Sequence, residues 1–472
     1  LAPSLAGLIS CNNDPASPGA GPSLRKAGRG DGGYGPLAPY APLADLGIIS
    51  LPAGFSAVAL SRAGDTMTDG RLVPYGHDGM AAFLAPVNRF DDEDAGEVVE
   101  EDDEDGDERE NGRVFLIRNH EVRDLPPLAR PIAPNPYDQA GGGTTNLRVL
   151  LRRDGSATLL KHYATLSGTH VNCAGGETPE GTWLTCEETI AGRKDANRVD
   201  TGFQRNHGYV FEVPATAARP VEPIPIKAMG RFDHEAVAVD PRTGYVYLTE
   251  DRTPSGFYRF LPEDRSRLRR GGKLEMLAIV GKREFDTSKN QPPGVRYRVR
   301  WVTIDQPDSD ASFLASGFVF NQGLAKGGAM FARLEGCWYG DRSVYFNSTS
   351  GGDVGAGQVW QYIPSRELLT LVYESPSFDV LNSPDNITVS PRGGLLLCED
   401  GAGINFLRGL TPDGRIFDFA SNDKSEWAGA CFSPQGNTLF VNVQGETFPG
   451  TNPAGTKGFT LAIWGPWEQG VL

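Results

Sequence analysis

A pair of short apolar segments, separated by a tight turn, recurs six times between about residue 50 and residue 450. The second segment of each pair runs into an acidic or amide residue at or near its end. These second segments are residues 112–121, 181–189, 244–252, 342–351, 393–401 and 437–445. A unit of this size cannot bury its apolar face alone, so the repeat predicts an array of small antiparallel sheets.

The first segments of the six pairs also match one another. They are residues 76–84, 170–176, 232–241, 331–341, 383–391 and 426–434. Six such units predict an all-β protein, a six-bladed β-propeller with long inter-blade loops, because radial closure leaves only short, protected strand edges. The 59 glycines and 35 prolines favour the same class, since they punctuate short strands and helical periodicity is scarce.

The chain divides into two parts on this interpretation. Residues 1–44 read as a residual export signal and linker, and residues 45–472 as a six-bladed catalytic domain. Two segments interrupt the repeat. Residues 91–110 form an acidic insert, and residues from about 261 to 310 are expected to be a loop insertion between the third and fourth units.

The first residues are apolar and small, then rich in Pro, Gly and Ser, as at the end of an export signal whose charged start is missing. The segment 8–11 also resembles a lipoprotein attachment box in which Cys11 would be modified. Both interpretations place the protein outside the cytoplasm, in the periplasm or beyond. No apolar stretch is long enough to span a membrane.

The net charge of −15 is concentrated in one place. Residues 91–110 hold 14 acidic residues against one arginine, so the remainder is nearly neutral. We interpret this segment as a solvated, disordered loop in preference to a calcium-collecting tail. The charge pattern has no nucleic-acid footprint, and we expect a monomer whose partner is a small substrate.

The six cysteines are residues 11, 173, 186, 337, 398 and 431, with no CxxC pair and no short disulfide framework. Four of them, from Cys186 onward, lie in apolar strands and are expected to be buried core thiols. Cys173 differs because it lies in a glycine-rich NCAGG segment. Only six histidines are present, so a bound metal would be held mostly by oxygen. That pattern favours calcium, with iron where a thiolate joins the site.

In a propeller the innermost strand of every blade lines one central channel, so equivalent positions converge. Those positions are Asp78, Cys173, Glu235, Glu335, Asp385 and Glu426. The ends of the neighbouring strands add Glu121, Glu187, Glu188, Glu250, Glu399 and Asp400. A single such glutamate is usually a solvated surface charge. So many carboxylates in register would repel one another severely without cations, which predicts a multi-metal cluster.

Two arginines are candidates for binding an anion near these carboxylates. Arg231 and Arg333 lie close in sequence to Glu235 and Glu335. A guanidinium matches a phosphate group bidentately, although a simple ion pair with a carboxylate is the alternative.

Several stretches carry a family resemblance from about residue 45 to residue 450. They are NHE, NCAGGETPEGTWLTCEE, GRFDHEAVAVDPRTGYVYLTED followed by SGFYRF, and FARLEG. Together they resemble the PhoX-type alkaline phosphatases, and the NCAGG…GTWLTCEE block is the specific part. The resemblance implies an exported propeller, often carried by the twin-arginine route, with two irons, several calcium ions and phosphomonoesters as substrates.

The resemblance also implies roles for particular residues. Cys173 would be the iron-bridging thiolate and Arg333 would hold the substrate phosphate beside Glu335 during in-line attack on phosphorus. Glu235, Glu250 and Glu335 would be iron or calcium ligands, and Glu121, Glu187 and Glu188 would complete the calcium sites. A second phosphate-binding arginine is expected in the last third, where Arg392 and Arg415 both lie in turn-like sequences.

Two other functions are compatible with the same repeat. One is a calcium-dependent propeller lactonase or esterase, which would need no thiolate ligand. The other is a non-catalytic surface propeller whose calcium is structural.

Overall fold

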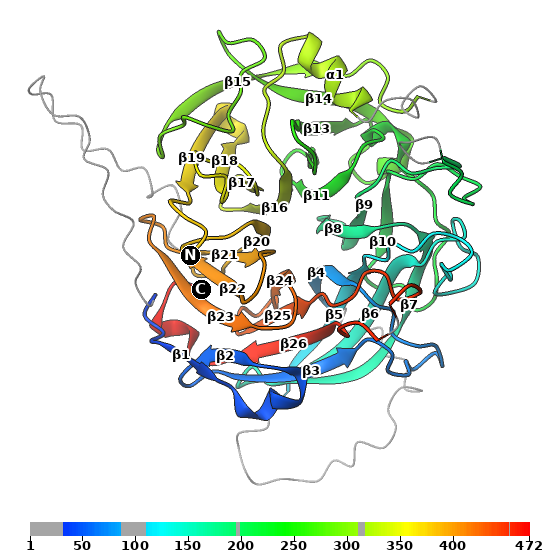
Figure 1. Ribbon diagram of the computed structural model, residues 1–472, viewed down its shortest axis with the longest axis vertical. Coiled ribbons are helices and arrows are strands. Elements are labelled where there is room, and N and C mark those ends of the chain that lie inside the picture. Colours follow the sequence, from blue (N-terminus) through cyan, green and yellow to red (C-terminus); the bar gives the residue numbers. More distant parts are fainter. Residues whose placement is uncertain (1–31, 86–109, 195–198, 310–316, 453) are drawn as a thin grey trace, which may run out of the picture.

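A computed structural model describes residues 32–85, 110–194, 199–309, 317–452 and 454–472. Strands dominate, and their sheets stand around a central axis, with β4, β8, β11, β16, β20 and β24 nearest to it (Figure 1). The prediction of a mostly-β, propeller-like fold is confirmed. The number of blades stays a prediction, because the strands hydrogen bond into five sheets.

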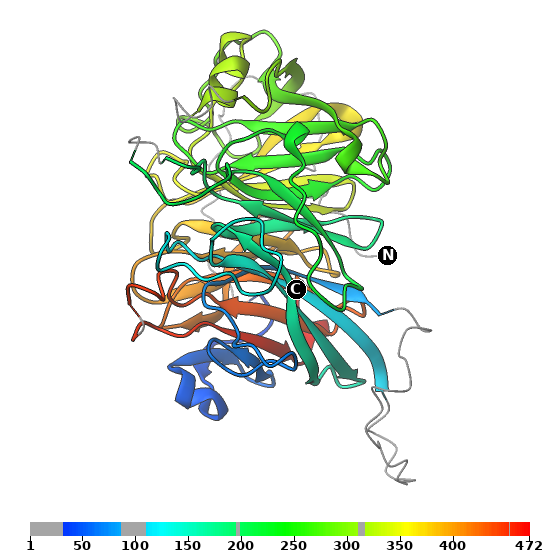
Figure 2. The ribbon, with the colours of Figure 1, turned by 90° about the vertical axis from the view of Figure 1, so that its right-hand side faces the viewer.

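The repeat pairs of the sequence correspond to the first two strands of successive antiparallel groups. One sheet runs in chain order through β4 (His77–Leu84), β5 (Glu110–His120), β6 (Gly142–Arg152) and β7 (Ala157–Thr169). In the side view these long strands extend past the neighbouring sheets (Figure 2). The next sheet contains β8 (Asn172–Glu177), β9 (Thr182–Glu187) and β10 (Val210–Pro214).

Two further groups merge into one nine-stranded sheet. The first consists of β11 (His234–Val239), β12 (Val246–Glu250), β13 (Phe257–Pro262), β14 (Gly272–Ile279) and β15 (Arg296–Thr303). The second consists of β16 (Leu334–Gly340), β17 (Ser343–Ser348), β18 (Gln358–Ile363) and β19 (Leu368–Glu374). They join because β15 pairs with β19 along their outer edges.

The last two sheets combine strands from both ends of the chain. β20 (Pro384–Val389), β21 (Leu395–Glu399), β22 (Asn405–Leu410) and β23 (Ile416–Asn422) are extended by β2 (Ile49–Pro52) and β1 (Leu37–Pro39). β24 (Trp427–Phe432), β25 (Thr438–Val443) and β26 (Phe459–Trp464) are completed by β3 (Ser56–Arg62). The ring is therefore closed by strands from the two ends of the fold.

The expected boundary of the first segment needs correction. Residues 32–44 were assigned to a linker, yet they belong to the fold, since β1 pairs with β2 and the Leu472 N–H donates to the Tyr34 hydroxyl at 2.9 Å. Residues 1–31, which include Cys11, lie outside the described residues. Residues 86–109 also lie outside them, and they include the acidic insert except for residue 110.

The segment from 261 to 310 also differs from the expected loop insertion. It contains β14 and β15, which are the outer strands of their sheet. Its charges lie mostly in the turns that precede β14 and β15 and on β15 itself, whereas β14 packs Leu274 and Met276 on one side and Leu277 on the other. The charged turns and the alternating arginines of β15 hide the short apolar run of β14 in the sequence.

The core lies between neighbouring groups of strands around the ring. Phe257 of β13 and Phe346 of β17 stack with ring centroids 4.2 Å apart, beside the buried Trp360 of β18. Cys186, Cys337, Cys398 and Cys431 are buried among apolar side chains, as expected. Adjacent sheets thus form a continuous packed layer that holds the inner strands in place.

Helices are short and peripheral. The α-helix α1 (Phe318–Ala325) lies at the outer rim of the ring (Figure 1). Among the described residues, 3-10 helices are found at Ala41–Leu46, Lys227–Met229, Leu268–Arg270, Pro364–Arg366 and Trp467–Gln469. None of the helices in the described part of the chain has the length and apolar character needed to cross a membrane.

Candidate metal centre

Each of the six inner strands contains a register irregularity against its second strand. It falls between His77 and Met80, Asn172 and Gly175, His234 and Val237, Leu334 and Cys337, Pro384 and Ile387, and Ala428 and Cys431. A bulge of this kind bends the strand and re-aims a side chain. In five of the six strands the bulge contains a residue expected to converge on the channel: Asp78, Cys173, Glu235, Glu335 and Asp385.

The ends of the second strands supply a further row of side chains. Glu121, Glu188, Asp251, Asp400 and Gln444 hold corresponding places, because each N–H donates to the carbonyl of a residue just ahead of an inner strand. For example, Glu121 N donates to Gly76 O at 2.8 Å, and Asp251 N donates to Asp233 O at 3.1 Å. These backbone bonds place both rows of side chains at the same end of the channel.

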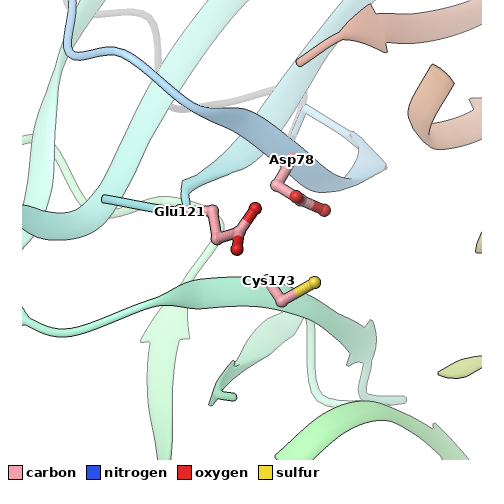
Figure 3. A group of neighbouring side chains, drawn as sticks. All are labelled: Asp78, Glu121 and Cys173. Atoms are coloured by element: carbon pink, nitrogen blue, oxygen red, sulfur yellow. The ribbon is translucent and has the colours of Figure 1, made fainter. Parts of the chain in front are cut away.

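The two rows enclose a cavity of about 220 Å³ at that end of the channel. Its lining residues are Glu121, Arg123, Cys173, Glu188, Glu235, Asp251, Arg333, Glu335, Asp385, Asp400, Glu426, Gln444 and Thr447. Asp78 adjoins the cavity beside Glu121 and Cys173, and the three side chains turn toward one another (Figure 3). Seven of the ten residues expected to bind metal therefore line the cavity together with Arg333, and one of the seven, Asp400, directly follows β21.

Glu426 reaches the cavity by a different route from the other converging residues. Its carbonyl accepts from Gln444 N at 3.2 Å, as the carbonyl of Arg333 accepts from Thr349 N at 2.8 Å. Glu426 therefore occupies the position in the last repeat that Arg333 occupies in the fourth. The bulged position, which holds a candidate ligand in the other five repeats, holds Ala428 in the last one. The prediction of a common position holds for five of the six residues.

Three groups of side chains are close enough to hold cations. They are Asp78 with Glu121 and Cys173, Cys173 with Glu188 and Glu235, and Asp385 with Asp400 and Glu426. Within each group the candidate ligand atoms lie within 4.8 Å of one another. Cys173 belongs to two of the groups, so its sulfur is placed where it could bridge two ions.

The donor set fits a mixed metal centre. Carboxylate oxygens suit calcium, whereas a thiolate suits iron or another transition metal. The buried Glu335 Oε2 has no hydrogen-bond partner among the described residues, which leaves an acceptor directed at the cavity without a donor. A buried carboxylate oxygen without a donor is costly, and a cation would remove that cost.

The protonation of these groups without metal is governed by burial. Burial raises the pKa of Asp78 and of Asp385 to about 7, and that of Glu121 to about 8. Burial and the neighbouring carboxylates raise the pKa of Cys173 well above its usual value. Its thiol accordingly donates a hydrogen bond to Glu235 Oε1 at 3.0 Å. Bound cations would reverse these shifts and favour the charged forms.

Two arginines lie at the mouth of the cavity. Arg333 pairs with Glu335 and with Asp251, and Arg123 pairs with Glu121 and with Glu188. Their side chains keep 39% and 36% of their exposure, so both guanidinium groups remain within reach of a ligand from solvent. Arg333 has φ +46°, a left-handed conformation that is unusual for a large residue and recurs at functional sites.

Arg123 was missed by the sequence analysis, which expected a second arginine in the last third of the chain. The available signal was its position two residues after Glu121, because side chains two apart share a face in extended backbone. Arg392 instead donates to Gly436 O at 2.8 Å, and Arg415 pairs with Asp413 in a turn. Arg231, the other expected anion binder, is buried and donates to the carbonyls of His207 and Ile190.

Glu187, Glu250 and Glu399 were expected among the metal ligands, and the structure does not bring them to the cavity. The reason is the two-residue period of a strand, because each precedes a residue that does face the cavity: Glu188, Asp251 and Asp400. Glu399 instead accepts from Arg408 at 2.7 Å, and Glu250 accepts from the Tyr258 hydroxyl at 2.7 Å. These carboxylates hold the sheets together behind the cavity.

Glu187 has the most extensive internal network of the three. It accepts from His207 Nδ1 at 2.6 Å and from the backbone N–H groups of His170 and Gly208. Burial disfavours the charged form of His207, but the charges of Glu187 and Asp138 outweigh it and raise the His207 pKa to about 9. Glu187 and His207 therefore form a buried ion pair.

Replacing Glu187 with glutamine is expected to destabilise the protein by on the order of 3 kcal/mol, because it leaves the buried partner uncompensated. The pair has a raised histidine pKa, so its contribution is fully present below about pH 6.5 and is lost as pH rises through about 9. Chemical denaturation across that range measures the effect. Metal content should stay at the wild-type level, and a loss of metal would instead assign Glu187 to the metal centre.

Comparison with known proteins gives a family assignment for this fold and cavity. The family described as alkaline phosphatase PhoX matches residues 32–447. A search of curated proteins found no match. Among solved structures, the chain is similar to Pseudomonas fluorescens PhoX in complex with vanadate, a transition state analogue. That match has a TM-score of 0.65 at 19% identity, and it covers 93% of this chain and 98% of the other.

Another match among solved structures is more distant. A gluconolactonase of Xanthomonas campestris has a TM-score of 0.37 at 12% identity, with 92% of this chain and 98% of that chain covered. The family match spans the strands from β1 to β25 and every lining residue of the cavity described above, from Glu121 to Thr447, together with the adjoining Asp78. This chain therefore belongs to the alkaline phosphatase PhoX family.

Proposed function

We propose that this phosphatase is exported and hydrolyses phosphomonoesters at an iron–calcium centre in the cavity described above. The single observation that carries the proposal is the place of Cys173, whose sulfur is shared by two groups of candidate ligands. A site for calcium alone has no use for a buried thiol between carboxylates, because calcium prefers oxygen. A thiolate between two ligand groups is suited to a pair of transition-metal ions.

The residues that would hold iron are Cys173 with the carboxylates nearest to it, Glu188 and Glu235, and with Asp78 and Glu121 on its other side. Asp385, Asp400 and Glu426 would hold calcium, because that group offers oxygen alone. Glu335 would contribute its unpartnered oxygen to the same centre. When bound, the cations would polarise the phosphoryl group and stabilise the charge that develops in the transition state.

The two arginines would bind and orient the phosphate group of the substrate. Each now lies between two carboxylates, which are themselves candidate metal ligands, so metal binding would release the guanidinium groups toward the cavity. A guanidinium can bind two phosphate oxygens at once and would fix the direction of the ester bond. The cavity is small and polar, which suits a phosphate group and leaves the organic part of the ester toward the mouth.

Replacing Arg123 with alanine is expected to raise the KM for a phosphomonoester about tenfold or more, and Arg333→Ala should do the same. The reason is the loss of a charge-assisted hydrogen bond of about 1.5–3 kcal/mol to phosphate. Lysine at either position should have an intermediate effect, since it keeps the charge and loses the bidentate geometry. Steady-state kinetics and vanadate inhibition measure these changes.

Arg205→Ala is the matched control, because this arginine packs over the Tyr137 ring and does not line the cavity. An Arg123→Ala variant with wild-type KM and vanadate affinity would remove Arg123 from the substrate site. It would leave the role of Arg333 to be judged by its own variant.

The metal content of protein purified without chelators tests the proposal as a whole. We expect iron together with calcium, turnover of a simple aryl phosphate, and inhibition by vanadate, which imitates the five-coordinate transition state of phosphoryl transfer. Calcium without iron, together with turnover of lactones or esters, would favour the calcium-dependent hydrolase instead. Calcium with no turnover of any ester would favour a structural propeller.

Export is the second part of the proposal, and its support is the family resemblance together with the small apolar start of the chain. Cell fractionation should find the protein in the periplasm or the medium. Radiolabelled palmitate would report a lipid at Cys11, and Cys11→Ser should abolish that label. Recovery of the protein in the cytoplasm alone would contradict this part.

A further inference from the structure

The bulges that aim the candidate ligands into the cavity have a cost in backbone hydrogen bonding. A bulged residue drops out of the ladder between its strand and the next, so its carbonyl loses its usual partner. A buried carbonyl without a donor is destabilising, and native proteins supply one from elsewhere. The donors found here are side chains of the sheet that precedes each inner strand around the ring.

Four side chains make such bonds to bulged residues that flank the cavity. Asn119 Nδ2 donates to Cys173 O at 2.9 Å, and Asn347 Nδ2 donates to Asp385 O at 2.7 Å. Asn442 Nδ2 donates to Asp78 O at 2.5 Å, and Thr249 Oγ1 donates to Glu335 O at 2.6 Å. All four donors hold the same place in their repeats, two residues before the second-strand position that ends at the cavity. We name these bonds the carbonyl clasps.

In the carbonyl clasp on Cys173, both the nitrogen and the oxygen of the Asn119 amide have hydrogen-bond partners. Asn119 Nδ2 also donates to Ala174 O at 2.8 Å, so one amide holds both bulged carbonyls. Asn119 Oδ1 accepts from Trp183 Nε1 at 2.8 Å. An amide can be turned end for end at little steric cost, and the indole N–H, which is only a donor, selects the orientation that keeps Nδ2 toward Cys173.

Packing leaves this bulge little room to move. A Cβ added to Gly175 would lie 2.1 Å from Leu184 O and 2.7 Å from the Trp183 ring. The strand after Cys173 is therefore pressed against β9, while Asn119 holds it from β5. Asn119 and Trp183 are both buried, so no water competes for these bonds. Together they fix where the Cys173 sulfur lies.

We propose that Asn119 is a positioning residue for the Cys173 thiol and that Trp183 sets the orientation of its amide. This inference rests on the proposed function, because it assigns Cys173 as the metal-binding thiol. Asn119 is not among the residues that line the cavity. It acts through the backbone of Cys173. Its loss should therefore let the Cys173 sulfur, which belongs to two groups of candidate ligands, move from its position.

The test compares Asn119→Ala with Asn146→Ala in the full-length protein. Asn146 is an equally buried asparagine on β6 with the same kind of bonding. Its Nδ2 donates to Ala215 O at 3.0 Å and its Oδ1 accepts from Thr165 Oγ1 at 2.7 Å, away from the cavity. Both variants lose one buried amide network, so both should lower the melting temperature. Only Asn119→Ala should alter Cys173.

The first readout needs no metal. In chelator-treated protein, the rate at which iodoacetamide alkylates Cys173 is followed by peptide mass spectrometry. Asn119→Ala should raise that rate about tenfold, because the bulge is released, whereas Asn146→Ala should leave it at the wild-type value. The second readout is titration with Co²⁺, followed by thiolate-to-cobalt absorption. The dissociation constant should rise about 10–100-fold for Asn119→Ala only.

The two readouts separate the inference from the function on which it rests. A wild-type protein without a thiolate-to-cobalt band would contradict the metal-binding role of Cys173, and alkylation would still decide the role of Asn119. Equal alkylation rates in wild type, Asn119→Ala and Asn146→Ala would overturn the inference. If Asn119→Ala does not fold, Trp183→Phe removes the N–H donor while keeping an aromatic ring, and should give a smaller change in the same direction. An unchanged Trp183→Phe protein would then overturn it.

Discussion

Replacing Cys173 with serine is expected to lower kcat/KM for phosphomonoester hydrolysis by more than about a hundredfold, since partners one step further from a metal already cost 10–100-fold. Serine preserves the size of the side chain and its hydrogen bond to Glu235, but a neutral hydroxyl is a poor ligand for iron. Iron content should fall with activity, while the calcium held by the all-oxygen group should remain. Metal analysis and steady-state kinetics on the same preparation measure both effects.

The control for this substitution is Cys431→Ser. Cys431 is a buried thiol among apolar side chains on β24, and it belongs to none of the three groups of candidate ligands. Its replacement should cost stability and leave iron in place. Full activity in Cys173→Ser would contradict a thiolate-bound centre and would point to the calcium-dependent hydrolase.

Removing metals is expected to destabilise the protein strongly at alkaline pH and much less at acidic pH. Eight carboxylates and two arginines line the cavity, so the metal-free site would carry a large excess of negative charge once its carboxyl groups are ionised. Burial raises the pKa of Asp78 and of Asp385 to about 7, and that of Glu121 to about 8. The folded protein therefore keeps protons that the unfolded chain has already released.

The sign of this pH dependence follows from linkage. Where the folded state binds more protons than the unfolded state, stability falls as pH rises. The metal-free protein should be most stable below about pH 4 with respect to these groups, and should lose that stability up to about pH 8. Thermal melts with a chelator at a series of pH values measure the slope.

Added calcium supplies the control for the same experiment. At a concentration one hundred times its dissociation constant, calcium should restore about 2.7 kcal/mol for each occupied site. It should also flatten the slope, because bound cations keep the carboxylates ionised. A metal-free protein with equal melting temperatures at pH 5 and pH 8 would contradict the charge repulsion inferred for the cavity.

Much of the candidate site could be predicted from the sequence because the repeat fixes its geometry. Five residues occupy the same place in their repeat units, so a common structural position was a sound inference. They are Asp78, Cys173, Glu235, Glu335 and Asp385. Counting along the second strands was less reliable. Where two acidic residues are adjacent, as in Glu187 and Glu188, only the phase of the strand decides which one faces the channel.

Other features have no local signal. Arg123 becomes part of the site because it pairs with Glu188 of a neighbouring sheet. The two residues are 65 positions apart, and a single sequence contains no signal for a contact of that kind. The strands between residues 261 and 310 were not predicted because charged turns flank the short apolar run of β14 and arginines alternate along β15. The role of Asn119 was equally hidden, since a bulge 54 residues away creates the need for its amide.

The closing pair of strands places the assembly of the centre late in folding. Ala59 of β3 pairs with Leu461 of β26, so the contact that completes the ring joins residues about four hundred positions apart. Forming it has a large entropic cost and requires nearly the whole chain to be available. The cavity draws side chains from Glu121 to Thr447, and no partial chain presents them together. Maturation is therefore ordered in time: the polypeptide is completed, the ring closes, and only then can ions be captured.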